Sequence, residues 1–299
     1  MTMLGAVCRP EIPPERLRDV ARAAEDSGLD ELWLWEDCFW GGAVAAASAV
    51  LGWTSRLRVG IGVLPVPLRN VALTAMEAAM LHRLFPGRVT VAVGHGVQDW
   101  MGQVGARAES PLTLLREHLA ALRALLRGDR VTSHGRYVQL ADVALGWPPA
   151  PPAAVGAPPV LAAATGPRTL RLSGELADGT ILHSGTTPGE LRRARELIGE
   201  GRAAAGRTDP HPLILYLLTA TGPGAPARLA KAIRDDGDQP GGASVAGDAP
   251  AVAAAVRSWA LGGADKVVLQ PAADDPDPAG FVRFAAEQVR PLLGPEQEP

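Results

Sequence analysis

Eight short apolar segments, separated by helical patterns, are the feature that most restricts the fold of this chain. They are Leu4 to Cys8, Glu31 to Trp35, Leu57 to Leu64, Val89 to Gly94, Pro159 to Ala164, Thr180 to His183, Leu213 to Thr219 and Lys266 to Gln270. Strands that alternate with helices indicate parallel βα units. Because closed barrels of this type take about 250 residues, the 299 residues predict an α/β fold, a (β/α)8 TIM barrel, as a single domain over residues 1–299.

The starts of several helices are marked by capping residues, whose side-chain oxygens accept hydrogen bonds from free backbone amides. Ser110-Pro111, the capping box Thr187-Pro188-Gly189-Glu190 and Asp277-Pro278 each predict such a start. Leu115, Leu119, Leu122 and Leu126 then form one apolar stripe, which Gly128 ends.

Two segments exceed what a minimal barrel needs. Arg130 to Pro158 is rich in Pro, Gly and Ala and follows the fourth strand and its helix, whereas Gly237 to Asp248 is rich in Gly and follows the seventh helix. We expect both to be loop insertions, one after strand 4 and one after helix 7.

The composition excludes several classes of function. The formal net charge of -3 and the pI near 6.1 come without any basic block, so nothing indicates nucleic-acid binding. Cys8 and Cys38 lie far apart and in no metal or redox spacing, which favours a reducing cytoplasm. The longest apolar stretches, such as Gly41 to Trp53, are shorter than the roughly 20 residues of a membrane helix. We therefore expect a cytoplasmic protein that does not bind a membrane.

Three polar residues at strand ends are candidates for proton transfer, because barrel enzymes carry their chemistry where strands end and helices begin. Asp37 follows the second strand among Trp35, Phe39 and Trp40, and apolar neighbours raise a carboxyl pKa. His95 and Asp99 follow the fourth strand. The alternative interpretation of each acid is that it caps a helix, and that of His95 is that it is a structural histidine.

Two further junctions are candidates for ligand binding. Gly60 and Gly62 stand where a strand favours branched side chains, which indicates the close approach of a planar ligand or, alternatively, a tight turn. Thr165-Gly166-Pro167-Arg168 leads into a helix, so free amides and a cation together predict an anion site, or simply a capped helix with a solvated arginine. His183-Ser184 at the sixth junction adds donors. No Walker loop, G-x-S-x-G or H-E-x-x-H motif is present, and the six histidines form no metal-spaced pair.

Four segments taken together resemble the bacterial luciferase-like superfamily, in particular the branch of methylene-tetrahydromethanopterin reductase and other deazaflavin (F420)-dependent oxidoreductases. They are Ser27 to Trp33, Leu84 to Gly96, Ser110 to Glu117 and Gly166 to Gly179. The resemblance implies a non-prolyl cis peptide at Gly62-Val63 behind the cofactor ring, and a cofactor phosphate at Thr165 to Arg168. The cofactor-binding residues expected on these grounds are Gly62, Val63, Leu64, Gly94, Thr165, Gly166, Arg168, His183 and Ser184.

The resemblance also implies hydride transfer between bound F420 and a small organic substrate. The alternative is an FMN-dependent monooxygenase that uses oxygen and reduced flavin from a partner flavin reductase. Two alternatives belong to other functional classes: a flavin-binding barrel without turnover, and a lyase that acts on a phosphate ligand. A homodimer is the expected assembly. Many relatives have histidine in place of Asp37, and the sugar-phosphate-oxidising relatives have glutamate in place of Val97, so the resemblance does not imply a particular substrate.

Overall fold

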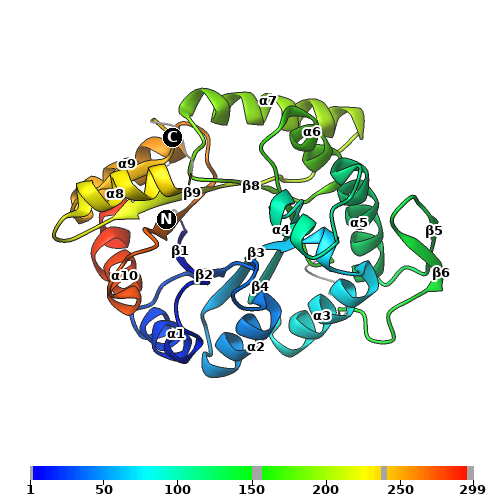
Figure 1. Ribbon diagram of the computed structural model, residues 1–299, viewed down its shortest axis with the longest axis horizontal. Coiled ribbons are helices and arrows are strands. Elements are labelled where there is room, and N and C mark those ends of the chain that lie inside the picture. Colours follow the sequence, from blue (N-terminus) through cyan, green and yellow to red (C-terminus); the bar gives the residue numbers. More distant parts are fainter. Residues whose placement is uncertain (1–2, 150–156, 237–240, 295–299) are drawn as a thin grey trace.

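The computed structural model describes residues 3–149, 157–236 and 241–294, and its strands close into the predicted barrel. The parallel ring has the order β1-β2-β3-β4-β7-β8-β9-β11, and β11 pairs again with β1. Helices surround the ring (Figure 1). The ring strands are β1 (Leu4–Cys8), β2 (Glu31–Leu34), β3 (Arg58–Pro65), β4 (Val89–Gly94), β7 (Val160–Ala163), β8 (Thr180–Leu182), β9 (Leu213–Ala220) and β11 (Lys266–Pro271). All eight predicted strands are confirmed, and each predicted end is within one residue of the observed one.

The helices alternate with these strands, as the sequence pattern predicts. They are α1 (Leu17–Asp26), α2 (Ala43–Trp53), α3 (Val71–Leu84), α4 (Gln98–Gln103), α5 (Pro111–Leu126), α6 (Pro167–Leu176), α7 (Pro188–Ala204), α8 (Ala225–Asp235), α9 (Ala249–Leu261) and α10 (Pro278–Arg283). Short 3-10 turns lie at Pro14–Arg16, Val66–Leu68 and Arg290–Leu293, and a π-helical turn at Phe284–Val289. Within the described ranges, no helix is long and apolar enough to cross a bilayer.

The three predicted helix starts are confirmed. Ser110 Oγ accepts a hydrogen bond from the amide of Thr113, and Asp277 Oδ1 accepts one from Gly280 at 2.9 Å. Thr187 and Glu190 bond reciprocally in a capping box. These caps fix where the helices leave the strand ends, and so where the junction residues lie.

Both predicted loop insertions contain strands. Within Arg130 to Pro158, β5 (Val131–His134) and β6 (Gln139–Val143) form an antiparallel hairpin outside the barrel, next to α5 (Figure 1). Within Gly237 to Asp248, β10 (Ser244–Ala246) pairs with the carboxyl end of β9. None of β5, β6 and β10 is buried along its whole length, so none shows the continuous apolar run of a barrel strand. Residues 150–156 and 237–240 of these insertions lie outside the described residues.

The barrel interior is filled by a small cluster that includes Trp33, Tyr216, Leu161 and Val268. A Cβ added at Gly60 would overlap the indole ring of Trp33. The planar group that approaches this glycine is therefore the protein's own indole, and neither a ligand nor a tight turn. A larger apolar layer separates the strands from the helices.

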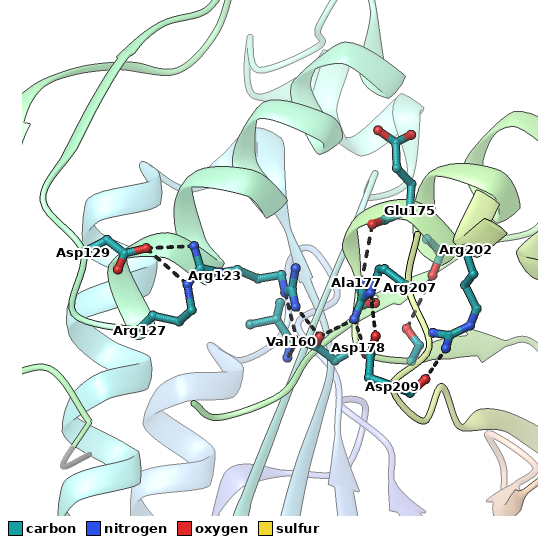
Figure 2. A network of polar contacts seen from close by, with 12 residues as sticks. Arg123, Arg127, Asp129, Val160, Glu175, Ala177, Asp178, Arg202, Arg207 and Asp209 are labelled. Carbon is teal, nitrogen blue, oxygen red and sulfur yellow. Dashed lines mark hydrogen bonds and ion pairs between the residues drawn. The ribbon is translucent and has the colours of Figure 1, made fainter. Parts of the chain in front are cut away.

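A polar network secures the amino ends of β7 and β8 (Figure 2). Asp178, just before β8, accepts hydrogen bonds from the backbone amide of Val160 at 3.0 Å, from Arg123 of α5 at 3.1 Å and from Arg207 at 2.9 Å. Arg207 also binds the carbonyl of Ala177. In barrels of this type the amino end of the strands supports stability and the carboxyl end carries the chemistry, so the functional site belongs at the other end.

Candidate active site

A cavity of about 260 Å³ lies at the carboxyl ends of the strands, where loops after β2, β3, β4, β7 and β8 converge. Seven of the residues predicted from the sequence line it: Asp37, Gly62, Val63, Gly94, His95, Thr165 and His183. Among the residues that the structure describes, no group of three or more His, Cys, Asp or Glu is placed to hold a metal ion.

The end of β3 forms one wall of this cavity. Gly62–Val63 is a cis peptide, as the resemblance implies, and the pairing of β3 with β4 shifts register between Ile61 and Leu64. Val63 lines the cavity, whereas Leu64 is only 2% exposed and packs in the apolar layer behind the strand. The structure therefore does not bring the side chain of Leu64 to the site.

A neighbour within the barrel also explains why residue 62 is a glycine. A Cβ at this position would overlap the hydroxyl of Tyr216, which donates a hydrogen bond to the Gly62 carbonyl at 3.0 Å. Burial raises the pKa of Tyr216, so this hydroxyl stays protonated at neutral pH. The glycine is required by this packing, whatever ligand lies above it.

Asp37 is the titratable group best suited to proton transfer. Burial, assisted by the negative charge of Glu11 and opposed by Arg9, raises the pKa of its carboxyl from 3.8 to about 6. A carboxyl with a pKa near 6 holds and releases a proton close to neutral pH, which general acid–base chemistry requires.

The neighbouring carboxylate, Glu36, has a structural role. Its Oε1 accepts a hydrogen bond from Arg69 at 2.8 Å, and its Oε2 accepts one from the amide of Ala43, the first residue of α2, at 3.0 Å. Arg69 is also bonded to Glu77 of α3. Glu36 is therefore occupied in fixing the loop that carries Asp37.

His95 faces the cavity from the end of β4. Its Nε2 lies 3.1 Å from Thr169 Oγ1 on α6, and the backbone of Pro111 at the start of α5 also interacts with the ring. Burial lowers the pKa of His95, so the ring is neutral at pH 7 and offers a hydrogen bond rather than a charge. Gly96 has a φ of +67°, which the turn into α4 requires and which favours glycine.

Asp99 is not brought into the cavity. Its side chain is 90% exposed and forms an ion pair with Arg107 at 3.1 Å. It lies in the first turn of α4, where an acid interacts favourably with the helix dipole. A structural role at a helix start is the alternative to proton transfer that the sequence left open for Asp99.

The segment predicted as an anion site follows the cavity residue Thr165, and Gly166, Arg168 and Ser184 do not themselves line the cavity. Gly166 is the N-cap of α6 and Pro167 its first residue, and no side chain caps this end, so the amides of Arg168 and Thr169 have no partner within the helix. Arg168 is exposed. Of this loop, Thr165 lines the cavity, and Ser184 follows His183 at the adjacent strand end.

Sequence reasoning missed several residues at the cavity. Tyr216 lines the cavity from β9. It interrupts the apolar run in the first half of this strand, and a polar residue in such a run is a sequence signal of a functional position. Trp100 and Met101 approach from α4, and no sequence signal gave their direction. Arg9 and Glu11 line a neighbouring cavity, but their charges act on the Asp37 carboxyl. Both closely follow β1, so a charged pair at a strand end was the sequence signal for them.

These features define a class of protein: a (β/α)8 barrel with a cavity at the carboxyl ends of its strands, lined by a carboxyl of raised pKa and a neutral histidine, and with an uncapped helix end after the same strand ends. Residues 3–265 match the luciferase-like monooxygenase family, and the chain belongs to that family.

Two curated relatives are oxidoreductases by name. The chain is 30% identical over 202 residues to a 5,10-methylenetetrahydromethanopterin reductase of Methanolobus tindarius, a match that covers 67% of this chain and 59% of the relative. It is 32% identical over 214 residues to an F420-dependent glucose-6-phosphate dehydrogenase of Kineococcus radiotolerans, covering 67% of this chain and 61% of that protein. The chain thus matches about three fifths of the length of these relatives.

Solved structures share the fold along the whole chain. An F420-dependent secondary alcohol dehydrogenase in complex with an F420–acetone adduct superposes with a TM-score of 0.87 at 20% identity, covering 98% of this chain and 99% of the other. The oxygenating constituent of 3,6-diketocamphane monooxygenase from Pseudomonas putida, in complex with FMN, gives a TM-score of 0.75 at 16% identity and covers 98% and 99%. At these identities the likeness establishes the barrel alone.

Proposed function

We propose that this protein is an F420-dependent oxidoreductase that transfers a hydride between the deazaflavin and a small organic substrate. The observation that carries the proposal is the cavity in which Asp37, with a pKa raised to about 6, and neutral His95 face the same space. The curated relative that is an F420-dependent glucose-6-phosphate dehydrogenase supports F420 as the cofactor. When bound, F420 supplies or accepts the hydride.

The residues present fit such a cofactor. Val63 and Ile181 give the cavity an apolar face, and His95, Thr165 and His183 give it hydrogen-bonding groups. This combination suits a flat ring system with polar edges. At about 260 Å³ this cavity is smaller than the roughly 300–1,000 Å³ of typical ligand sites, so we assign to it the ring system alone. Val63 and Gly94 would contact the ring, and the free amides at the start of α6, with Arg168, would hold the phosphate. Asp37 would give a proton to the substrate oxygen, or take one from it.

The alternative is an FMN-dependent monooxygenase supplied with reduced flavin by a partner reductase. The match to the luciferase-like monooxygenase family favours it as the second candidate. Its oxygen requirement distinguishes it, because deazaflavins react poorly with oxygen. For either cofactor we propose a cytoplasmic location, which the free thiols of Cys8 and Cys38 support.

Titration of the purified protein with F420 and with FMN, followed by cofactor fluorescence, tests the proposal. We expect saturable binding of F420, with FMN binding at least about tenfold more weakly, a difference of 1.4 kcal/mol. Tighter binding of FMN, combined with oxygen consumption when the flavin is reduced, would establish the monooxygenase instead. Binding of neither cofactor would refute both assignments.

Arg168→Ala is expected to weaken F420 binding by about 1–3 kcal/mol, or roughly 5- to 150-fold, because a charge-assisted hydrogen bond to phosphate is lost. Arg171→Ala is the matched control on the same helix, since Arg171 pairs with Glu200. The measurement is the dissociation constant from the same titration. Equal dissociation constants for Arg168→Ala and the unchanged protein would remove the start of α6 from the binding site.

We also propose that the protein is a homodimer, with the outer face of α3 at the interface. Leu73, Met76, Met80 and Leu84 are 47%, 60%, 54% and 62% exposed on this one helix, beside Trp147 at 72%. A groove of about 530 Å³ is lined by Met76, Met80 and Trp147. Contiguous apolar surface of this kind marks protein–protein interfaces, and large side chains of this type form their buried centres.

Met80→Glu is expected to weaken dimerisation about 100-fold or more, because it buries an unpaired charge at the interface. Analytical ultracentrifugation at micromolar concentration would then show mostly monomer. Leu261→Glu is the control, since Leu261 is 90% exposed on α9 and outside this groove. If Met80→Glu and the unchanged protein sediment alike, α3 does not form the interface.

A further inference from the structure

A second cavity opens at the carboxyl ends of β1 and β2, next to the one proposed to hold the cofactor ring. Its volume is about 350 Å³, within the range of roughly 300–1,000 Å³ found for small-molecule sites. Most of its wall is apolar, from Ile12, Leu17, Leu34 and Ala46. Nothing in the proposed binding of cofactor ring and phosphate uses this space.

The polar groups in this wall neutralise one another. Arg9 is only 8% exposed, and its Nη2 donates to Glu11 Oε1 at 2.8 Å, while its Nε donates to Glu11 Oε2 at 3.3 Å. Burial raises the pKa of the Cys8 thiol to about 12, so that side chain is neutral as well. A charged ligand group would have to break the Arg9–Glu11 pair, whereas an uncharged apolar group leaves it intact.

The entrance carries two exposed aromatic rings. Phe39 is 60% exposed and Trp40 is 62% exposed, and both line the cavity. Large apolar side chains at the mouth of a pocket gain free energy when a ligand covers them.

The two cavities share one segment of chain as their boundary. Trp35 lines the apolar cavity, and Asp37, two residues later, lines the cavity assigned to the cofactor ring. Because two residues of extended chain span at most roughly 7 Å, the apolar cavity begins within about that distance of the Asp37 backbone.

We propose that this cavity is the substrate subsite, and that it binds the uncharged apolar part of a substrate whose reacting oxygen lies at Asp37. The identity of the occupant as substrate rests on the proposed hydride transfer. The affinity of the cavity for neutral apolar molecules does not, and the experiments separate the two.

The first experiment measures binding in the absence of cofactor, using the neutral fluorescent probe N-phenyl-1-naphthylamine and the full chain. Ala46→Phe fills the cavity and is expected to weaken probe binding at least about tenfold. Ala45→Phe, on the exposed side of the same helix, is the matched control and should bind as the unchanged protein does. If the titration curve of Ala46→Phe coincides with that of the unchanged protein, the probe binds elsewhere and the proposal fails.

A second variant keeps this test decisive if Ala46→Phe does not fold. Trp40→Ala removes a ring that is 62% exposed, so folding should be little affected. It should weaken probe binding about 3- to 10-fold, the effect of one aromatic contact. Unchanged binding in a folded Trp40→Ala protein would overturn the assignment.

The second experiment measures reduction of straight-chain 2-alkanones, from acetone to 2-decanone, by the protein with reduced F420. KM is expected to fall about fourfold for each added methylene until the cavity is filled, because each buried methylene contributes equally. Ala46→Phe should abolish this dependence. Reduction with a KM independent of chain length would refute the subsite and leave the proposed function standing. A third outcome is that no ketone is reduced while Ala46→Phe still abolishes probe binding. That outcome would refute hydride transfer to ketones and support the apolar site.

Discussion

Asp37→Asn is expected to lower kcat about 100-fold or more, the usual contribution of a positioned general acid or base. The substitution keeps the shape of the side chain and removes the proton that its carboxyl carries. F420 affinity should change less than about twofold, since none of the proposed cofactor contacts is lost. Steady-state kinetics with an accepted substrate, together with the fluorescence titration, measure the two quantities.

The pH dependence gives this prediction a second readout. Because the pKa of Asp37 is raised to about 6, kcat in the direction of substrate reduction should fall as pH rises through 6 and the proton is lost. In the direction of oxidation, kcat should rise through the same range. Asp37→Asn should abolish this transition.

Two comparisons decide whether the role belongs to Asp37. Asp99→Asn alters an exposed acid paired with Arg107, so its kcat should be close to normal. His95→Gln tests a second titratable group that lines the cavity. Near-normal kcat in Asp37→Asn with a large loss in His95→Gln would assign proton transfer to the histidine, and near-normal kcat in both would refute the acid–base assignment.

The raised pKa of Asp37 also has a consequence for stability. Between pH 4 and 6 the folded state retains a proton that the unfolded chain, with an ordinary pKa of 3.8, has released. The folded state therefore loses stability as pH rises through about 6. Since Asn has no charged form, Asp37→Asn should be more stable than the unchanged protein at pH 7, which is the trade-off expected at a functional residue.

The barrel was predictable because each of its strands is buried on both faces. Leu213–Ala220 is buried at every residue, and Val89–Gly94 is buried at all but one, so both read as continuous apolar runs. The hairpin of β5 and β6 was not predictable by the same signal, because its residues are mostly exposed or half-buried. Three-residue β10 is too short to show a period.

The site was predictable in its location but not in the direction of every side chain. Strand-end position placed Asp37 and His95 correctly at the cavity, yet the same rule named Asp99, which α4 turns outward to Arg107. Gly60 and Gly62 were noticed as unusual, but their reason depends on Trp33 and Tyr216, which contact them only after the barrel closes. Contacts between residues so distant in sequence leave no local pattern.

A buried ion pair at the amino end of the barrel is the interaction whose loss should destabilise the fold most. Lys266 Nζ lies 2.6 Å and 2.7 Å from the two carboxylate oxygens of Glu31, and their side chains are only 11% and 5% exposed. Glu31 also accepts a hydrogen bond from Trp33 Nε1 at 3.0 Å. The pair therefore holds both β11 and the central indole in place.

Lys266→Met is expected to lower the free energy of unfolding by about 3–5 kcal/mol, because it leaves the Glu31 carboxylate buried without its partner. Urea unfolding followed by tryptophan fluorescence measures this change. Lys231→Met is the control, since Lys231 and Asp235 form an exposed pair on one helix that contributes less than about 1 kcal/mol. Adding Glu31→Gln to Lys266→Met removes the unpaired charge but keeps an acceptor for Trp33, so it should recover most of the loss. A loss below about 1 kcal/mol in Lys266→Met would contradict this prediction. It would mean that water or Arg58, whose Nε lies 3.8 Å from Glu31, already compensates the carboxylate. The double variant would then be no more stable than the single one.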